Sequence, residues 1–166
     1  MEKIIKCAII GYGYMGEIRR RVIERNEYSS LTMICEVNKE KLSTDQGFVV
    51  TRDPAAVIES DVDAVFICTP NYQIPDLTIR CLDRGKHVFC EKPPGRTLKD
   101  IEEMRNAEKR NVGSKLMFGF NHRYHDSIIL AKKIIDSKKY GKLINLKGLY
   151  GKSKIIDFAG TGEWRS

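Results

Sequence analysis

The sequence predicts an α/β protein with a doubly wound parallel sheet, and two observations support that fold class. Short apolar runs of strand length alternate with helix-compatible segments up to about residue 120. This order is the one expected of a parallel sheet with right-handed crossovers. The second observation is a glycine-rich string, Gly11-Tyr12-Gly13-Tyr14-Met15-Gly16, placed between the first apolar run and a helix-compatible segment.

The first strand is predicted over residues 4–10, and the glycine string ends it. Gly11 permits a tight turn, Gly13 has no Cβ to block a pyrophosphate, and Gly16 lets the helix lie close to the strand. Free backbone N–H groups at the start of the next helix, within residues 17–26, favour a diphosphate. Strand, glycine turn and helix together predict a Rossmann-type dinucleotide site.

The second strand is predicted over residues 31–35 and is followed by Glu36, twenty positions beyond Gly16. At the carboxyl end of a strand this carboxylate can accept hydrogen bonds from a ribose diol, and it would repel a 2′-phosphate. We therefore predict NAD as the cofactor, with NADP less favoured. The alternative is an ordinary glycine turn followed by a surface glutamate, which the strand–turn–helix context makes the weaker interpretation.

The alternation continues through the middle of the chain. A short helix at residues 39–46 and a strand at residues 48–51 precede a helix that Asp53 caps and Pro54 opens. The continuous apolar run at residues 64–68 is typical of a central parallel strand that is covered on both faces.

Two further strands and helices complete the predicted sheet. A helix at residues 73–84 stops at Gly85, and a fifth strand follows at residues 87–90. Thr97 and Asp100 predict a capping box for the next helix. The apolar stripe of that helix consists of Leu98, Ile101 and Met104, and the sixth strand covers residues 116–118.

The pattern after residue 120 is different. Residues 126–139 predict an amphipathic helix, and residues 142–150 alternate apolar and polar side chains, as in a half-exposed antiparallel strand. One strand needs a partner for its apolar face. We therefore expect the truncated start of a second α/β domain, with self-association into a homo-oligomer or disorder after about residue 150.

Composition restricts the class of protein. Of the 166 residues 42% are hydrophobic, and none of the apolar runs reaches the roughly eighteen residues of a membrane span. The five cysteines form no C-x-x-C pair and lie in strand or helix patterns. Buried, reduced thiols explain this best, so we predict a cytoplasmic protein without disulfides.

The net charge of +7 is concentrated in residues 121–166, which carry ten Lys and Arg against four Asp and Glu. Such a surplus can indicate a nucleic-acid surface, a membrane surface or an anionic substrate. The chain has no recognised nucleic-acid motif and no aromatic stacking platform. A solvated helix face, or an unbalanced share of a larger protein, explains the surplus better, and we predict no nucleic-acid or membrane partner.

In an open parallel sheet the ligand crevice lies beyond the carboxyl ends of the strands. Three predicted loops meet there: the glycine turn, Thr69-Pro70-Asn71-Tyr72 and Glu91-Lys92-Pro93-Pro94. A hydride-transfer enzyme needs a group that holds the substrate hydroxyl near the nicotinamide, and Lys92 is the candidate. The alternative is an ordinary solvated lysine after a strand.

These loops resemble those of the Gfo/Idh/MocA oxidoreductases, the relatives of glucose–fructose oxidoreductase and inositol dehydrogenase. The resemblance rests on the glycine string, on residues 63–71 and 85–93, and on residues 118–124 and 140–143. It implies an NAD(P)-binding Rossmann domain over residues 1–120 and the incomplete start of a substrate and oligomerisation domain over residues 121–166. It also implies NAD(P)-dependent chemistry on a hydroxyl or carbonyl of a sugar, a cyclitol or a sugar nucleotide.

By the same resemblance, Lys92 is the catalytic residue and a cis Lys92–Pro93 bond is expected, while no metal site is implied. The residues implied to bind the cofactor are Gly11, Tyr12, Gly13, Tyr14, Met15, Gly16, Glu36, Thr69, Pro70, Asn71, Glu91, Lys92 and Pro93.

Two departures from the family pattern limit these expectations. Ile74 stands where many members have a histidine. The family's Asp-x-x-x-His segment, which usually supplies the catalytic histidine, would follow a Trp-Arg pair like Trp164-Arg165, and the sequence stops at Ser166. We therefore expect this polypeptide alone to bind cofactor with little turnover. The alternative is a non-enzymatic dinucleotide sensor or scaffold in which Lys92 is a relic.

Overall fold

The computed structural model describes residues 3–38, 47–149 and 151 of the chain. The chain divides into two units, residues 1–120 and residues 121–166, and each is described by itself. The helix predicted at residues 39–46 lies outside the described residues, as does the stretch after residue 151 for which self-association or disorder is predicted.

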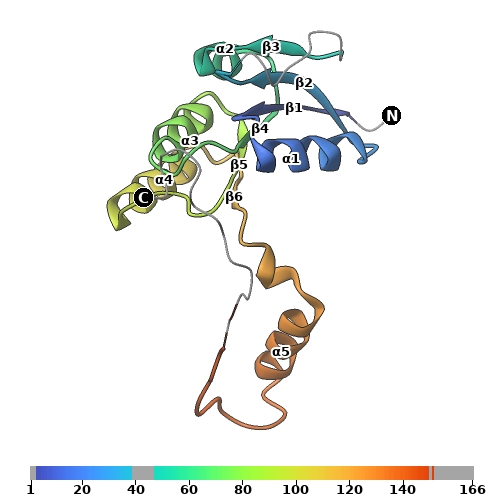
Figure 1. Cartoon of the computed structure of the whole chain (residues 1–166). Coiled ribbons are helices and arrows are strands. Elements are labelled where there is room, and N and C mark those ends of the chain that lie inside the picture. The colour runs from blue at the N-terminus through green and yellow to red at the C-terminus, as the bar shows by residue number, and fades with distance from the viewer. Residues whose placement is uncertain (1–2, 39–46, 150, 152–166) are drawn as a thin grey trace. The chain divides into compact units, whose positions relative to one another are not determined.

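The first unit is built on one six-stranded parallel sheet, which confirms the predicted fold class (Figure 1). The strands are β1 (Ile5–Ile10), β2 (Ser29–Cys35), β3 (Val49–Thr51), β4 (Ala64–Ile67), β5 (His87–Cys90) and β6 (Leu116–Phe118). Their order in the sheet is β3-β2-β1-β4-β5-β6. The order reverses between β1 and β4, and in sheets of this kind ligands bind at that point.

Helices cover both faces of the sheet because alternate side chains of each strand point to opposite sides. On one face α1 (Tyr14–Glu24) packs its Ile23 against Ile9 and Ile34. The other face carries α2 (Pro54–Glu59), α3 (Ile74–Asp83) and α4 (Leu98–Arg110). The larger apolar core lies between these three helices and the sheet, with Val65 and Ile67 at its centre.

The helix ends follow the local signals in the sequence. The Asp53 side chain accepts a hydrogen bond of 2.9 Å from the backbone N–H of Ala55. Thr97 and Asp100 form the predicted capping box. Helix α1 starts at Tyr14, three residues earlier than predicted, because Gly13 already adopts the extended conformation of an N-cap residue.

The predicted apolar stripe of α4 is only partly buried. Met104 is fully buried and Ile101 packs against the core, but Leu98 is 83% exposed. Leu98 is the first residue of the helix, one turn before the residues that reach the core. Its position on the stripe therefore does not bring it into contact with the other layers.

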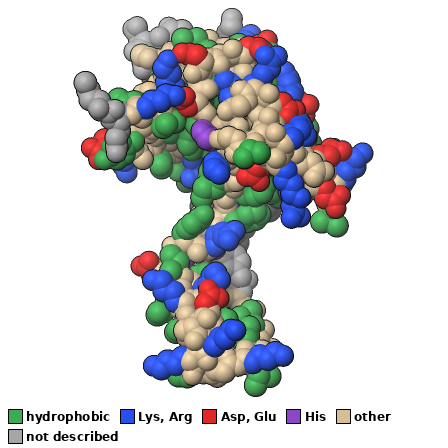
Figure 2. Space-filling view, turned by 180° about the vertical axis from the view of Figure 1, so that it is seen from behind, with side chains coloured by type: hydrophobic (Ala, Val, Ile, Leu, Met, Phe, Trp, Pro, Cys, Tyr) green, Lys and Arg blue, Asp and Glu red, His purple; other side chains and the backbone are tan. Residues whose placement is uncertain are grey.

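The second unit contains a short 3₁₀ turn (Asn121–Tyr124) and the predicted helix, α5 (Asp126–Asp136). Apolar side chains and basic side chains lie side by side on its surface (Figure 2). The strand predicted at residues 142–150 is wrong for residues 142–149, none of which is in a strand. An alternating pattern forms a strand only when another strand pairs with it, and among the described residues these have no such partner.

All five cysteines are free thiols, and four of them are buried while Cys68 is half-buried, in agreement with their prediction as small core residues. Among the helices of the described residues, none has the length and apolarity needed to cross a membrane.

Candidate functional site

Three of the predicted site segments meet at the carboxyl edge of the sheet. In the register of the sheet Ile10 of β1 lies beside Ile67 of β4, which lies beside Cys90 of β5. The loops that leave these three adjacent strands are the glycine turn, the Thr69 loop and the Glu91 loop. The structure therefore places them next to one another, and the first two flank the point where the strand order reverses.

Two of the three glycines in the turn are required by packing alone. Gly11 has a φ of +90°, and a Cβ on it would lie 2.9 Å from the Cys68 carbonyl. A Cβ on Gly16 would lie 2.3 Å from the carbonyl oxygen of Gly11. Since L side chains rarely adopt the first conformation and the second contact is impossible, both positions need glycine whether or not a ligand binds.

Gly13 is different, because nothing in its surroundings requires a glycine. It has a φ of −81°, which any L residue adopts, and no atom lies within 4 Å of the position of a Cβ. The open space lies at the N-cap of α1, where backbone N–H groups and the helix dipole favour an anion. A pyrophosphate group fits this space, and a side chain at residue 13 would occupy it.

Glu36 is held by the backbone on both sides of its carboxylate. One oxygen accepts a hydrogen bond of 2.7 Å from the N–H of Tyr12, and the other accepts one of 2.9 Å from the N–H of Asn38. The carboxylate therefore lies against the glycine turn in a fixed orientation. Each oxygen retains acceptor capacity that two ribose hydroxyls could use.

Thr69 carries an orphaned hydroxyl at the same edge. Its Oγ1 is buried and has no hydrogen-bond partner among the described residues. Buried hydroxyls almost always have a partner, and a ligand bound at this edge is one group that could supply it. The open space at Gly13, the oriented carboxylate of Glu36 and the Thr69 hydroxyl together fit a dinucleotide.

The Glu91 loop contains a buried carboxylate next to an exposed amine. Glu91 is 6% exposed, and its Oε1 accepts hydrogen bonds of 2.7 Å and 2.5 Å from the Arg19 guanidinium. Lys92 is exposed. The Lys92–Pro93 peptide bond is cis, as predicted.

Arg19 is the residue at this edge that sequence reasoning missed. It follows Gly16 by three positions and so shares a face of α1 with it, but Arg20 and Arg21 stand directly beside it in the sequence. The three-residue spacing from Gly16 is the only sequence signal for Arg19. It does not show that Arg19, and not one of its two neighbours, contacts Glu91.

The thiol of Cys68, which follows β4 at this edge, is not a nucleophile. Burial, and to a smaller extent the negative charge of Glu91, raise the pKa of Cys68 to about 12. At neutral pH the thiol is protonated, whereas a catalytic cysteine needs a thiolate. Cys68 is instead part of the apolar contacts of the α1 face.

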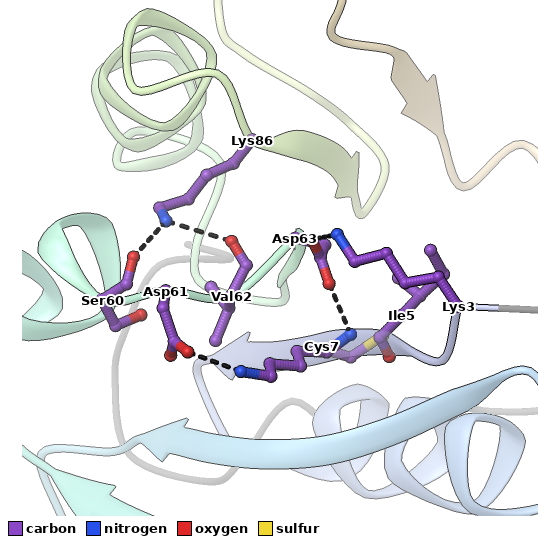
Figure 3. Close-up of polar contacts among 9 residues, drawn as sticks. Lys3, Ile5, Cys7, Ser60, Asp61, Val62, Asp63 and Lys86 are labelled. Carbon is purple, nitrogen blue, oxygen red and sulfur yellow. Dashed lines mark hydrogen bonds and ion pairs between the residues drawn. The ribbon is translucent and has the colours of Figure 1, made fainter.

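A separate group of polar contacts lies at the amino ends of the strands (Figure 3). Lys3 pairs with Asp63 at 2.6 Å, and this hydrogen bond is the main reason why the pKa of the Asp63 carboxyl is lowered. The ammonium group of Lys86 is buried and donates to the backbone carbonyls of Ser60 and Val62 at 2.6 Å and 3.1 Å. These contacts connect β1, β5 and the segment before β4, on the edge opposite the crevice.

No group of three or more His, Cys, Asp or Glu side chains in the described residues is arranged to hold a metal ion. The arrangement at the carboxyl edge can instead bind an elongated ligand that carries phosphates near Gly13 and a ribose near Glu36. Lys92 follows β5 at the same edge of the sheet.

Comparisons with known proteins agree with the observed fold. Residues 5–120 match the Gfo/Idh/MocA family, an oxidoreductase family with an NAD-binding Rossmann fold. The myo-inositol 2-dehydrogenase of Thermotoga maritima is 30% identical over 146 residues, which are 83% of this chain and 42% of that protein. The levoglucosan dehydrogenase of Pseudarthrobacter phenanthrenivorans is 32% identical over 117 residues, 69% of this chain and 30% of that protein.

Among solved structures, the scyllo-inositol dehydrogenase from Lactobacillus casei, with bound NAD(H) and scyllo-inositol, is similar to this chain with a TM-score of 0.76 and 31% identity. The similarity covers 84% of this chain and 43% of that one. The chain thus spans less than half the length of each of these proteins.

Proposed function

The chain belongs to the Gfo/Idh/MocA oxidoreductase family, and we propose that it binds NAD(H) in the crevice at the carboxyl edge of its sheet. We propose further that it is the cofactor-binding portion of a dehydrogenase that acts on a hydroxyl or carbonyl of a sugar, a cyclitol or a sugar nucleotide. The names of the related inositol and levoglucosan dehydrogenases support this substrate class.

Each part of the crevice has a role in this proposal. The N–H groups around Gly13 hold the pyrophosphate, and the Glu36 carboxylate accepts hydrogen bonds from the adenosine ribose. The Thr69 loop lines the dinucleotide. NAD, when bound, supplies the group that accepts or donates the hydride, and Lys92 holds the substrate hydroxyl beside it and stabilises negative charge that develops on that oxygen.

The open space at Gly13 is the observation that carries the proposal. The protein has no internal reason to keep a glycine there, and the space lies where a pyrophosphate would sit. A methyl group at residue 13 should therefore interfere with the ligand while leaving the fold unchanged.

We predict that Gly13→Ala weakens NADH binding by about tenfold or more, about 1.4 kcal/mol, with no loss of thermal stability. NADH titration followed by fluorescence and by calorimetry measures the affinity, and circular dichroism measures the melting temperature. The matched control is Gly113→Ala. Gly113 also has no atom within 4 Å of its Cβ position, and it lies before the amino end of β6, away from the carboxyl edge of the sheet. That variant should bind NADH like the wild type.

Wild-type affinity in Gly13→Ala would show that the space does not hold the cofactor. Failure of the wild-type chain to bind NADH at millimolar concentration would overturn the proposed function as a whole.

A further inference from the structure

A buried ion pair connects the phosphate end of the crevice with the Lys92 end. Arg19 lies on α1, the helix that begins at the glycine turn, and Glu91 directly precedes Lys92. The side chains of Arg19 and Glu91 are 19% and 8% exposed. The guanidinium donates both its Nε and Nη2 hydrogens to Glu91, and its carbon lies 4.5 Å from the centre of the Phe89 ring.

Glu91 is fixed from two more directions. Its backbone N–H donates to the carbonyl of Ile67 at 2.9 Å, which continues the pairing of β5 with β4. A Cβ on Gly119, just beyond β6, would lie 2.9 Å from Oε2 of Glu91, so the carboxylate fills the space that a side chain there would need. The pair therefore joins α1 with the carboxyl ends of β4, β5 and β6.

Stability alone does not account for this arrangement. Burying two charges costs solvation energy that offsets most of their attraction, and an apolar pair of similar volume often serves as well. What an ion pair supplies, and an apolar pair does not, is a fixed orientation through two hydrogen bonds to a planar guanidinium. The group whose orientation this pair determines is the backbone that carries Lys92.

We propose that Arg19 is a positioning residue for Lys92. It holds the Glu91 carboxylate, and through the backbone of Glu91 it sets the distance between Lys92 and the phosphate end of the crevice. In this assignment Arg19 acts through Glu91, whose carboxylate is bound by the guanidinium and does not contact the cofactor itself. The inference rests on the proposed NAD site, and it adds a residue outside all the loops of that site.

The test separates the two ends of the ligand. ADP reaches only the glycine turn and Glu36, whereas NADH also reaches the Lys92 end. We predict that Arg19→Met weakens NADH binding by about tenfold and leaves ADP binding within about twofold of the wild type. Methionine preserves most of the stem that packs on Phe89 but removes both donors. Calorimetric titration of the 166-residue chain with each ligand gives the two affinities.

Three further variants sharpen the comparison. Arg21→Met removes the same charge from the same helix, but Arg21 forms an exposed pair with Glu17, so both ligands should bind as they do to the wild type. Arg19→Lys keeps the charge with one donor group and should restore part of the NADH affinity. In Arg19→Met/Glu91→Leu, the loss of NADH affinity should equal that of Arg19→Met or of Glu91→Leu alone, because each single change removes the same interaction.

The outcomes are distinct. Equal weakening of ADP and NADH by Arg19→Met would mean that Arg19 only supports α1, and unchanged binding of both would mean that it has no role; either result overturns the inference alone. If wild type binds neither ligand, the proposed function fails and the inference with it. If Arg19→Met does not fold, Arg19→Lys and Glu91→Leu give the same comparison.

Discussion

Glu36 shows how one side chain can decide which cofactor fits. Its carboxylate is fixed by the N–H groups of Tyr12 and Asn38, so it cannot easily turn away from a ligand. A ribose diol can donate to it, but a 2′-phosphate would place a second anion against it in a partly buried site. The sequence predicts this residue from its position after the second strand, whereas its two backbone donors are visible only in the folded chain.

We therefore predict that Glu36→Ala lowers the preference for NADH over NADPH by at least about tenfold. The variant should also lose about 1 kcal/mol of unfolding free energy, because the partly buried N–H of Tyr12 loses its acceptor. Parallel titrations with the two cofactors give the ratio, and urea unfolding gives the stability. Glu59→Ala, which removes an exposed carboxylate paired with Arg84, serves as the control. An unchanged ratio would mean that Glu36 does not face the ribose.

At the scale of whole elements, prediction succeeded where the signals are local. The bounds of β5 and β6 agree with prediction, since short apolar runs between glycines and polar residues define strands without reference to the rest of the fold. Residues 142–149 show the opposite case, because their alternation needs a partner strand. Lys86 shows a third case: its acceptors, Ser60 and Val62, lie 26 and 24 positions away, so its role cannot be predicted from neighbouring residues.

The Lys86 side chain connects the start of β5 to the end of α2. Removing its ammonium group should therefore lower the stability of the fold without changing the cofactor site. We predict that Lys86→Met destabilises the protein by about 1–3 kcal/mol, because two backbone carbonyls lose a charged donor. The folded variant should bind NADH like the wild type, since these contacts lie at the amino edge of the sheet. Lys99→Met, at an exposed pair with Glu103, should change stability by less than about 0.5 kcal/mol. A large loss of NADH affinity in folded Lys86→Met would show that the two edges are coupled.

For the molecule as a whole, the cysteines link burial to the pH range of stability. Burial raises the pKa of Cys81 from 9.0 to about 12, and it acts in the same direction on the other four thiols. In the unfolded chain the thiols ionise near pH 9.0, but in the folded chain they stay protonated. Their contribution to stability is therefore fully present below pH 9 and is lost as the pH rises towards 12.

Cys81 gives the cleanest test because it is fully buried between α3 and the sheet. In the wild type, unfolding releases a thiol that ionises, whereas Cys81→Ala has no such group. We predict that the stability difference between the two proteins narrows by about 1.5 kcal/mol between pH 9 and pH 10.5. Lysines and tyrosines titrate in both proteins and cancel. Ile58→Val, a core truncation without a thiol, should keep a constant difference in urea unfolding across the same range. A constant difference for Cys81→Ala as well would mean that this thiol ionises in the folded protein as readily as in the unfolded chain, and that the core around it admits water.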